Sequence, residues 1–186
     1  NGLSDPERLA PGSVIALSFA PDEWDDARRR AAALEPYNRG VDAMEAGDFD
    51  RAQREFQSSL QTAPELTDAQ YNLALVLMKR GQHQEAERRL TTLSSQRPQD
   101  ADIGFALGNC LFYQTRYDEA AAAFHRVLAS HPRHLRAAFG EALSLHEAGR
   151  RTEAIAAWNA YLILDSDSSW SEAARRYLGE LQGGER

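Results

Sequence analysis

The residues with reactive side chains are few and scattered in this chain of 186 residues. Three histidines, His125, His131 and His134, are close enough in sequence for two imidazoles to reach one metal ion. A turn that contains Pro132 and has no cysteine nearby is a poor zinc site, so we interpret them as solvated histidines. We find no phosphate-binding loop, no nucleophile beside a base and no catalytically spaced carboxylate pair. We therefore assign no catalytic residue, no metal ligand and no cofactor.

Two acidic segments have simpler explanations than ion binding. Asp165 and Asp167 alternate with serines up to Ser169 and could hold a cation, but the segment is better interpreted as a solvated link before a final helix. The acidic residues from Asp22 to Asp26 suit the positive N-terminal end of a helix dipole. Binding of a basic partner is the alternative for this second segment.

Composition excludes several classes of function. One cysteine, Cys110, excludes an internal disulfide, and a packed thiol is favoured over a redox or nucleophilic one. A formal net charge of -7 argues against general nucleic-acid binding, which needs a basic surface. No segment approaches the ~20 apolar residues of a membrane helix, so we expect no direct membrane insertion. The first residue, Asn1, is not methionine, so a targeting segment, lipid anchor or upstream domain could have been removed; cytoplasm and periplasm both stay open.

A period of 34 residues organises most of the chain. Alanines recur at this interval, with turn residues five positions before them and large apolar residues four positions after them. Prolines close three of the units, because proline cannot continue a helix. Each unit therefore predicts a helix, a tight turn, a second helix and a break. The columns are Ala52, Ala86, Ala120 and Ala154; Gly47, Gly81, Thr115 and Gly149; Phe56, Leu90, Phe124 and Trp158; and Pro64, Pro98 and Pro132.

These columns, with small residues at Gly40, Ala74, Gly108 and Ala142, resemble the tetratricopeptide repeats (TPR). The resemblance implies an all-α fold, a right-handed superhelical solenoid of antiparallel helix pairs with four repeats at about 33–66, 67–100, 101–134 and 135–168. It also implies a protein-interaction module and not an enzyme. The tryptophan usual in the first helix is missing. Charged residues replace a leucine column at Arg39 and Glu141, in the terminal units where a face lacks a stacking neighbour.

The two ends depart from the period. Residues 1–21 are expected to form an extended or mobile arm around the apolar run Val14–Phe19. A capping helix is predicted over 22–34, with Trp24, Ala27, Ala31 and Leu34 forming a face that lies on the first repeat. Ser169 and Glu172 form a capping-box pattern for a second capping helix over 169–182, with Trp170 on its apolar side, and 183–186 is a tail.

The resemblance implies that the first helix of each unit lines a concave groove. The most uniform column there is aromatic in every unit, and two further columns lie on the same helical stripe at steps of four and three residues. Three asparagines stand next to these columns or within them. The predicted groove residues are Tyr37, Asn38, Val41, Met44, Tyr71, Asn72, Leu75, Met78, Phe105, Asn109, Phe112, Phe139, Leu143 and His146.

Aromatic and methionine side chains favour an apolar or amphipathic peptide as the ligand of this groove. The asparagines could bond to the ligand's backbone, but pairs such as Tyr37 with Asn38 could instead pack between helices. His146 is either a polar, pH-sensitive contact or an ordinary surface histidine. Binding of a partner's terminal carboxylate is disfavoured because the groove positions carry no cation.

Three functions of different kinds follow. The first is a module that binds a protein or peptide partner within a bacterial assembly, an origin suggested by the use of arginine at every basic position except Lys79. The second is a self-associating scaffold in which the N-terminal arm fills its own or a neighbour's groove, giving a homo-oligomer. The third is an accessory domain of a larger enzyme.

Overall fold

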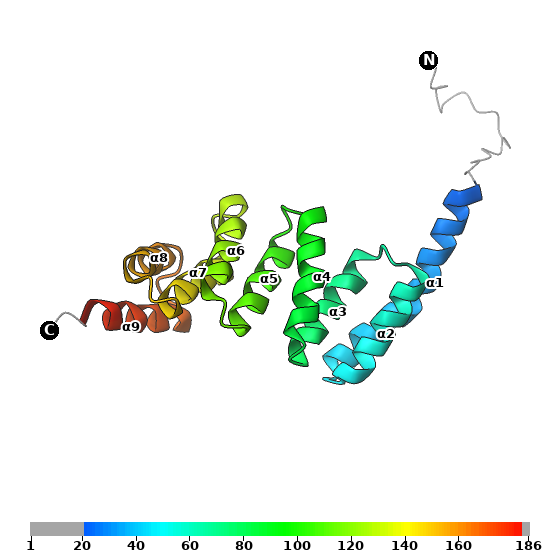
Figure 1. Ribbon diagram of the computed structural model, residues 1–186, viewed down its shortest axis with the longest axis horizontal. Coiled ribbons are helices and arrows are strands. Elements are labelled where there is room, and N and C mark those ends of the chain that lie inside the picture. Colours follow the sequence, from blue (N-terminus) through cyan, green and yellow to red (C-terminus); the bar gives the residue numbers. More distant parts are fainter. Residues whose placement is uncertain (1–20, 184–186) are drawn as a thin grey trace, which may run out of the picture.

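The computed structural model describes residues 21–183, and within them the chain forms helices and no strands. Figure 1 shows the helices in one extended row, with α1 at one end and α9 at the other. The prediction of an all-α helical repeat solenoid is confirmed. The helices are α1 (Pro21–Glu45), α2 (Phe49–Thr62), α3 (Thr67–Lys79), α4 (His83–Gln96), α5 (Ala101–Tyr113), α6 (Tyr117–Ser130), α7 (Leu135–Glu147), α8 (Arg151–Leu164) and α9 (Ser169–Gly183).

The turns inside the four helix pairs share one backbone conformation. Gly47, Gly81 and Gly149 have φ angles of 75°, 75° and 72°, and Thr115 has 59° at the equivalent position. In each turn the residue that follows donates its N–H to a carbonyl five residues before it, as Gln82 does to Leu77. Left-handed backbone is the usual way to end a helix, and glycine adopts it without a steric penalty. Thr115 is the one β-branched residue in this column.

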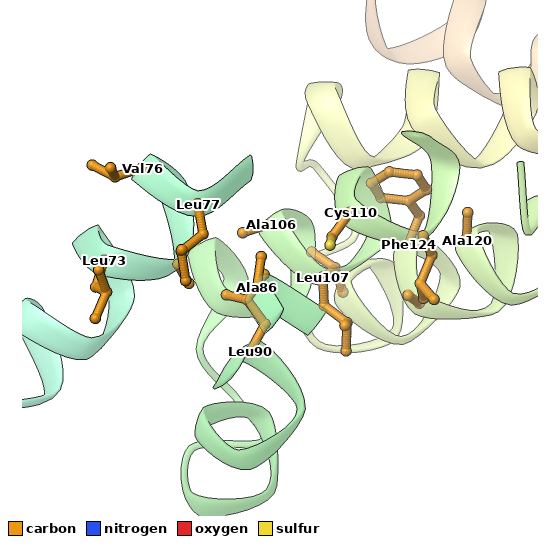
Figure 2. Close-up of a cluster of buried hydrophobic side chains, with 14 of the residues drawn as sticks. Leu73, Val76, Leu77, Ala86, Leu90, Ala106, Leu107, Cys110, Ala120 and Phe124 are labelled. Atoms are coloured by element: carbon orange, nitrogen blue, oxygen red, sulfur yellow. The ribbon is translucent and has the colours of Figure 1, made fainter. Parts of the chain in front are cut away.

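The buried core follows the alanine and large apolar columns. Ala52, Ala86, Ala120 and Ala154 are completely buried. In two repeats the large residue is a phenylalanine that meets a glycine on the paired helix: a Cβ at Gly108 would lie 2.5 Å from the Phe124 ring. Figure 2 shows Ala86, Leu90, Ala120 and Phe124 among the buried apolar side chains of repeats two and three. Close approach of helix and ring therefore requires a small residue in that column.

The core divides into two clusters. The first draws mainly on α1 to α6 and includes Phe56, Leu90 and Phe124. The second draws mainly on α7 to α9 and is built around Trp158 and Tyr161. Leu128 of α6 packs against both clusters. Each helix thus contacts its neighbours along the row, as expected for a solenoid.

The N-terminal region differs from its prediction. We expected a capping helix over 22–34 followed by a separate repeat helix, whereas α1 is one helix that runs through Pro36. Pro36 has no N–H, so the Ala32 carbonyl four residues before it has no donor within the helix. The buried Ser59 hydroxyl of α2 donates to the Ala33 carbonyl at 2.9 Å in this turn. That bond ties the turn before Pro36 to α2, and the burial of Ala33 and Pro36 in the packed helix pair offsets the hydrogen bond lost at the proline.

The apolar face predicted on the capping helix does not lie on the first repeat. Ala33 and Pro36 are buried, whereas Ala27, Ala31 and Leu34 are exposed, as is Trp24. These four side chains occupy the opposite side of α1 because the helix packs on α2 through the face that contains Ala33. The N-terminal half of α1 also extends beyond α2 (Figure 1).

The C-terminal helix is capped one residue earlier than the sequence pattern indicates. The Ser168 hydroxyl accepts from the N–H groups of Trp170 and Ser171 at 3.1 and 3.2 Å, so Ser168 performs the role expected of Ser169. The predicted N-terminal arm, up to residue 20, and residues 184–186 of the predicted tail lie outside the described residues. No helix between residues 21 and 183 combines the length and apolarity needed to cross a membrane.

Candidate functional site

The predicted groove residues all lie on the first helix of a pair, α1, α3, α5 or α7. Thirteen of the fourteen are partly exposed and partly buried, and Asn38 is exposed. The apolar members pack with one side against the buried core. Such side chains line a surface and support it at the same time, so each must be assigned from its contacts.

In the first two repeats one hydrogen bond joins two of the predicted groove residues. Asn72 donates to the Tyr37 hydroxyl at 3.2 Å, which links α3 to α1. The Tyr37 ring also lies 5.8 Å from the Phe56 ring, centroid to centroid. These contacts favour the structural alternative for Tyr37 and Asn72. Burial, followed by the nearby carboxylates of Asp102 and Asp100, raises the pKa of the Tyr71 hydroxyl, which keeps this group neutral and able to donate.

The last two repeats and the start of α9 enclose an apolar pocket of about 540 Å³. Its aromatic lining comes from α5, α6, α7, α8 and α9. Five predicted groove residues border it, and the predicted groove residues of α1 and α3 do not. The five are Phe105, Asn109, Phe112, Phe139 and Leu143.

Three exposed apolar side chains at this pocket were missed in the sequence. Tyr113, Leu135 and Trp170 are 66%, 43% and 60% exposed, and all three line the pocket. Tyr113 follows the predicted Phe112, and Leu135 begins the fourth repeat, so neither falls in a groove column. Trp170 was expected on the apolar side of the capping helix. A search for large apolar residues at helix ends would have found all three.

Aromatic contacts hold in place the wall of the pocket that Phe139 and Trp170 form. The Phe139 ring packs edge-on against Trp158, Tyr161 and Trp170, with centroid distances of 5.0, 5.3 and 4.9 Å. Edge-to-face pairs at these distances are favourable beyond their buried area. Trp158 is fully buried, so Phe139 and Trp170 are held by the core of the second cluster.

Two charged groups stand among the lining residues. The Arg136 guanidinium lies 4.8 Å from the centre of the Phe105 ring and 3.6 Å from an Asp102 carboxylate oxygen. At the link before α9, the Asp165 carboxylate accepts from the Ser168 hydroxyl and from the Tyr161 hydroxyl, the latter at 2.6 Å. These bonds, that of Ser168 first, lower the pKa of Asp165. Burial, and then the hydrogen bond to the Asp165 carboxylate, raise the pKa of the Tyr161 hydroxyl to about 12.

His146, the last predicted groove residue, lies away from the pocket lining. Its ring meets the Tyr177 ring of α9 at 5.1 Å, and its Nδ1 is buried without a hydrogen-bond partner. His125 Nδ1 lies 2.8 Å from a Glu141 oxygen, and His134 Nδ1 accepts from the Ala137 N–H at the start of α7. No metal-ligand cluster of three His, Cys, Asp or Glu residues occurs within 21–183.

A pocket of about 600 Å³ lies at the turn between α3 and α4, and its chemistry is different. Its lining is dominated by glutamines and by charged groups that pair with one another, such as Arg88 and Arg89 with Glu85. His83 Nδ1 and Arg89 Nε in this lining are buried without a hydrogen-bond partner, but the charged heads are paired and the rest of the lining is polar, so a ligand would cover little apolar surface there. We therefore consider the apolar pocket beside α7 the better binding site despite its smaller volume.

Comparison with known proteins identifies the family of this chain. Two sequence models of the tetratricopeptide repeat match residues 43–108 and 105–169, which together cover most of the helical row. The chain is a tetratricopeptide repeat protein. No curated protein matches the TPR chain significantly.

Solved structures show the same TPR fold. A tetratricopeptide repeat protein from Parabacteroides merdae has a TM-score of 0.74 at 17% identity, over 82% of this chain and 61% of its own. YrrB, described as a TPR protein with an unusual peptide-binding site, has a TM-score of 0.71 at 23% identity, over 78% of this chain and 75% of its own. MamA has a TM-score of 0.75 at 20% identity, over 82% of this chain and 81% of its own.

Proposed function

We propose that this TPR protein binds a peptide segment of a partner protein by inserting large apolar side chains of that segment into the pocket between α5, α7 and α9. One observation carries the proposal. Six large hydrophobic side chains are exposed within residues 21–183, and three of them, Tyr113, Leu135 and Trp170, line this pocket; Tyr113 also borders the pocket at the turn between α3 and α4. Exposed apolar residues gathered at one concavity are typical of an interaction site.

The pocket has the dimensions and lining of a ligand site. Its volume of about 540 Å³ lies within the range of roughly 300–1,000 Å³ typical of binding pockets. Trp170 and Tyr113 are amphipathic rings that lose little conformational freedom when a ligand covers them, and such residues dominate binding energy at interfaces. The Phe139 contacts to Trp158 and Trp170 hold one wall in place before a ligand arrives.

Polar groups at the pocket suit a peptide better than a lipid or a purely apolar molecule. The Asn109 side chain lines the pocket and carries both a donor and an acceptor, which matches the N–H and C=O of a peptide backbone. Arg136, exposed beside Phe105, could exchange its exposed ion pair with Asp102 for one with an acidic residue of the ligand. The peptide-binding site named for YrrB, a protein of the same fold, is consistent with this function.

The test begins with selection of peptide ligands. Random peptides displayed on phage are selected on the full chain, and the dissociation constant of the best synthetic peptide is measured by fluorescence polarisation. We expect selected peptides to be rich in large apolar residues. Trp170→Ala should raise the dissociation constant at least about 30-fold, as expected for truncation of a hot-spot residue.

The matched control is Ile163→Ala. Ile163 lies on α8, is 85% exposed and does not line the pocket, so its variant should bind the peptide like the native protein. Because Trp170 is exposed, circular dichroism should be the same for both variants. If the Trp170 variant bound the peptide as tightly as the native protein, the pocket would not be the binding site.

A further inference from the structure

The N-terminal half of α1 carries an apolar stripe on the side opposite to α2. Its members are Trp24, Ala27, Ala31 and Leu34, with Trp24 56% and Leu34 47% exposed. The stripe is separate from the pocket beside α7 and from the predicted groove columns. Exposed residues of this size are few in the described part of the chain, so two of them on one helix face define a second candidate surface.

The stripe has a shallow centre. Two alanines lie between the tryptophan and the leucine, so small side chains are flanked by large ones at both ends. At 1.5 Å per residue, Trp24 and Leu34 are about 15 Å apart along the helix axis. A second apolar segment of similar length can therefore pack its side chains over Ala27 and Ala31, between the two larger ones.

The chain itself contains such a segment next to α1. The run Val14–Phe19 lies outside the described residues and ends two positions before Pro21, the first residue of the helix. Six extended residues span roughly 16–20 Å at about 3.3 Å each, which matches the stripe. In an extended chain Ile15, Leu17 and Phe19 point to one side, so all three largest residues of the segment share a face.

We propose that Val14–Phe19 of the same molecule folds back over Trp24, Ala27, Ala31 and Leu34 and covers this stripe. Pro21 suits the first position of α1 and disfavours helical backbone in the residue before it, so α1 does not continue into this segment and the chain is free to change direction there. The segment from Gly12 to Ala20 carries no charge, so its docking buries no unpaired ion. The proposal is independent of peptide binding at the pocket beside α7.

Disulfide trapping in the full chain tests the proposal. Counted back from the helix start, Leu17 falls opposite Ala27 and Ala31, so the test pair is Leu17→Cys with Ala31→Cys. The control pair is Leu17→Cys with Ala32→Cys, since Ala32 is also exposed but points about 100° away around the helix. Cys110 is retained because it is fully buried and burial raises the pKa of its thiol to about 11, which makes its exchange slow.

Both pairs have nearly the same tether length and effective concentration, so a difference in rate reports docking. The proposal requires a disulfide-linked monomer to form at least about five-fold faster in the test pair than in the control pair. Equal rates would mean that the segment does not dock on this face. A disulfide-linked dimer as the main product of the test pair would assign the stripe to a second copy and overturn the proposal.

Discussion

Thr115 occupies a left-handed position that glycine occupies in the equivalent turns, and its replacement tests how much strain this turn holds. Thr115 has a φ angle of 59°, close to the 75° of Gly81 in the preceding repeat. Its side chain is exposed, so glycine gives up little packing there. We expect Thr115→Gly to stabilise the protein.

The magnitude follows from two opposing terms. Left-handed backbone costs a residue with a Cβ roughly 1–2 kcal/mol. Glycine returns about 0.4–1 kcal/mol of this through the larger conformational freedom of the unfolded chain. The net gain is about 0.5–1 kcal/mol, which for a protein of this length raises the melting temperature by about 1–4 °C.

The reciprocal variant is Gly81→Thr. A Cβ at Gly81 meets no atom within 4 Å, so the substitution adds backbone strain without a clash. It should lower the melting temperature by a similar amount. Both shifts are measured by calorimetry, with urea unfolding to verify that the m-value is unchanged. A lower melting temperature for Thr115→Gly, or no change for Gly81→Thr, would refute the strain argument.

Gly140→Ala and Tyr161→Phe probe the pocket from its supporting side, and Gly179→Ala is a control for the first of them. Gly140→Ala places a Cβ 2.8 Å from the buried Phe124 ring, and this clash should outweigh the gain in helix propensity. We expect the variant to be destabilised by about 1–3 kcal/mol in urea unfolding. Gly179→Ala in α9 has open space around its Cβ and should instead stabilise the protein by about 0.5–1 kcal/mol. Tyr161→Phe removes a bond that lowers the pKa of Asp165, so carboxyl NMR should show that pKa rising toward its usual value. Since the folded-state pKa lies below the unfolded one, this carboxylate stabilises the fold above its unfolded pKa and loses that effect as the pH falls through the folded pKa. In the variant the folded pKa lies closer to the unfolded one, so the loss of stability should be smaller and should be complete at a higher pH. An unchanged titration would show that the Tyr161 bond contributes nothing to this pKa, and that the Ser168 hydroxyl and the backbone N–H groups of Asp167 and Ser168 set it.

The regular part of the fold was predictable because each repeat is a local unit. The alanine, large apolar and turn columns act within a helix pair or between neighbours, so a 34-residue period is sufficient to define the pairs. Pro36 is the exception. A general rule that proline ends a helix failed there, because burial against α2 and the bond from Ser59 to the Ala33 carbonyl stabilise a continuous helix.

The candidate site was predictable only in part. Phe105, Phe112 and Phe139 fall in repeating columns, and the structure places them at the pocket. Trp170 lies beyond the last repeat, where no column applies. The direction of the Trp170 side chain depends on the link before α9, which hydrogen bonds of Asp165 and Ser168 hold in place. The 34-residue repeat does not extend to this link and therefore does not predict its geometry.

The boundary between the two core clusters passes through the pocket. Phe105 and Phe112 pack on the cluster of α1 to α6, whereas Phe139 and Leu143 pack on that of α7 to α9. A ligand seated between them contacts both clusters and binds only while they are joined. By mass action, the binding free energy of the ligand then stabilises the packing between the two clusters, which Leu128 also connects. We therefore expect the ligand to increase protection from hydrogen exchange more in α7 to α9 than in α1 to α4.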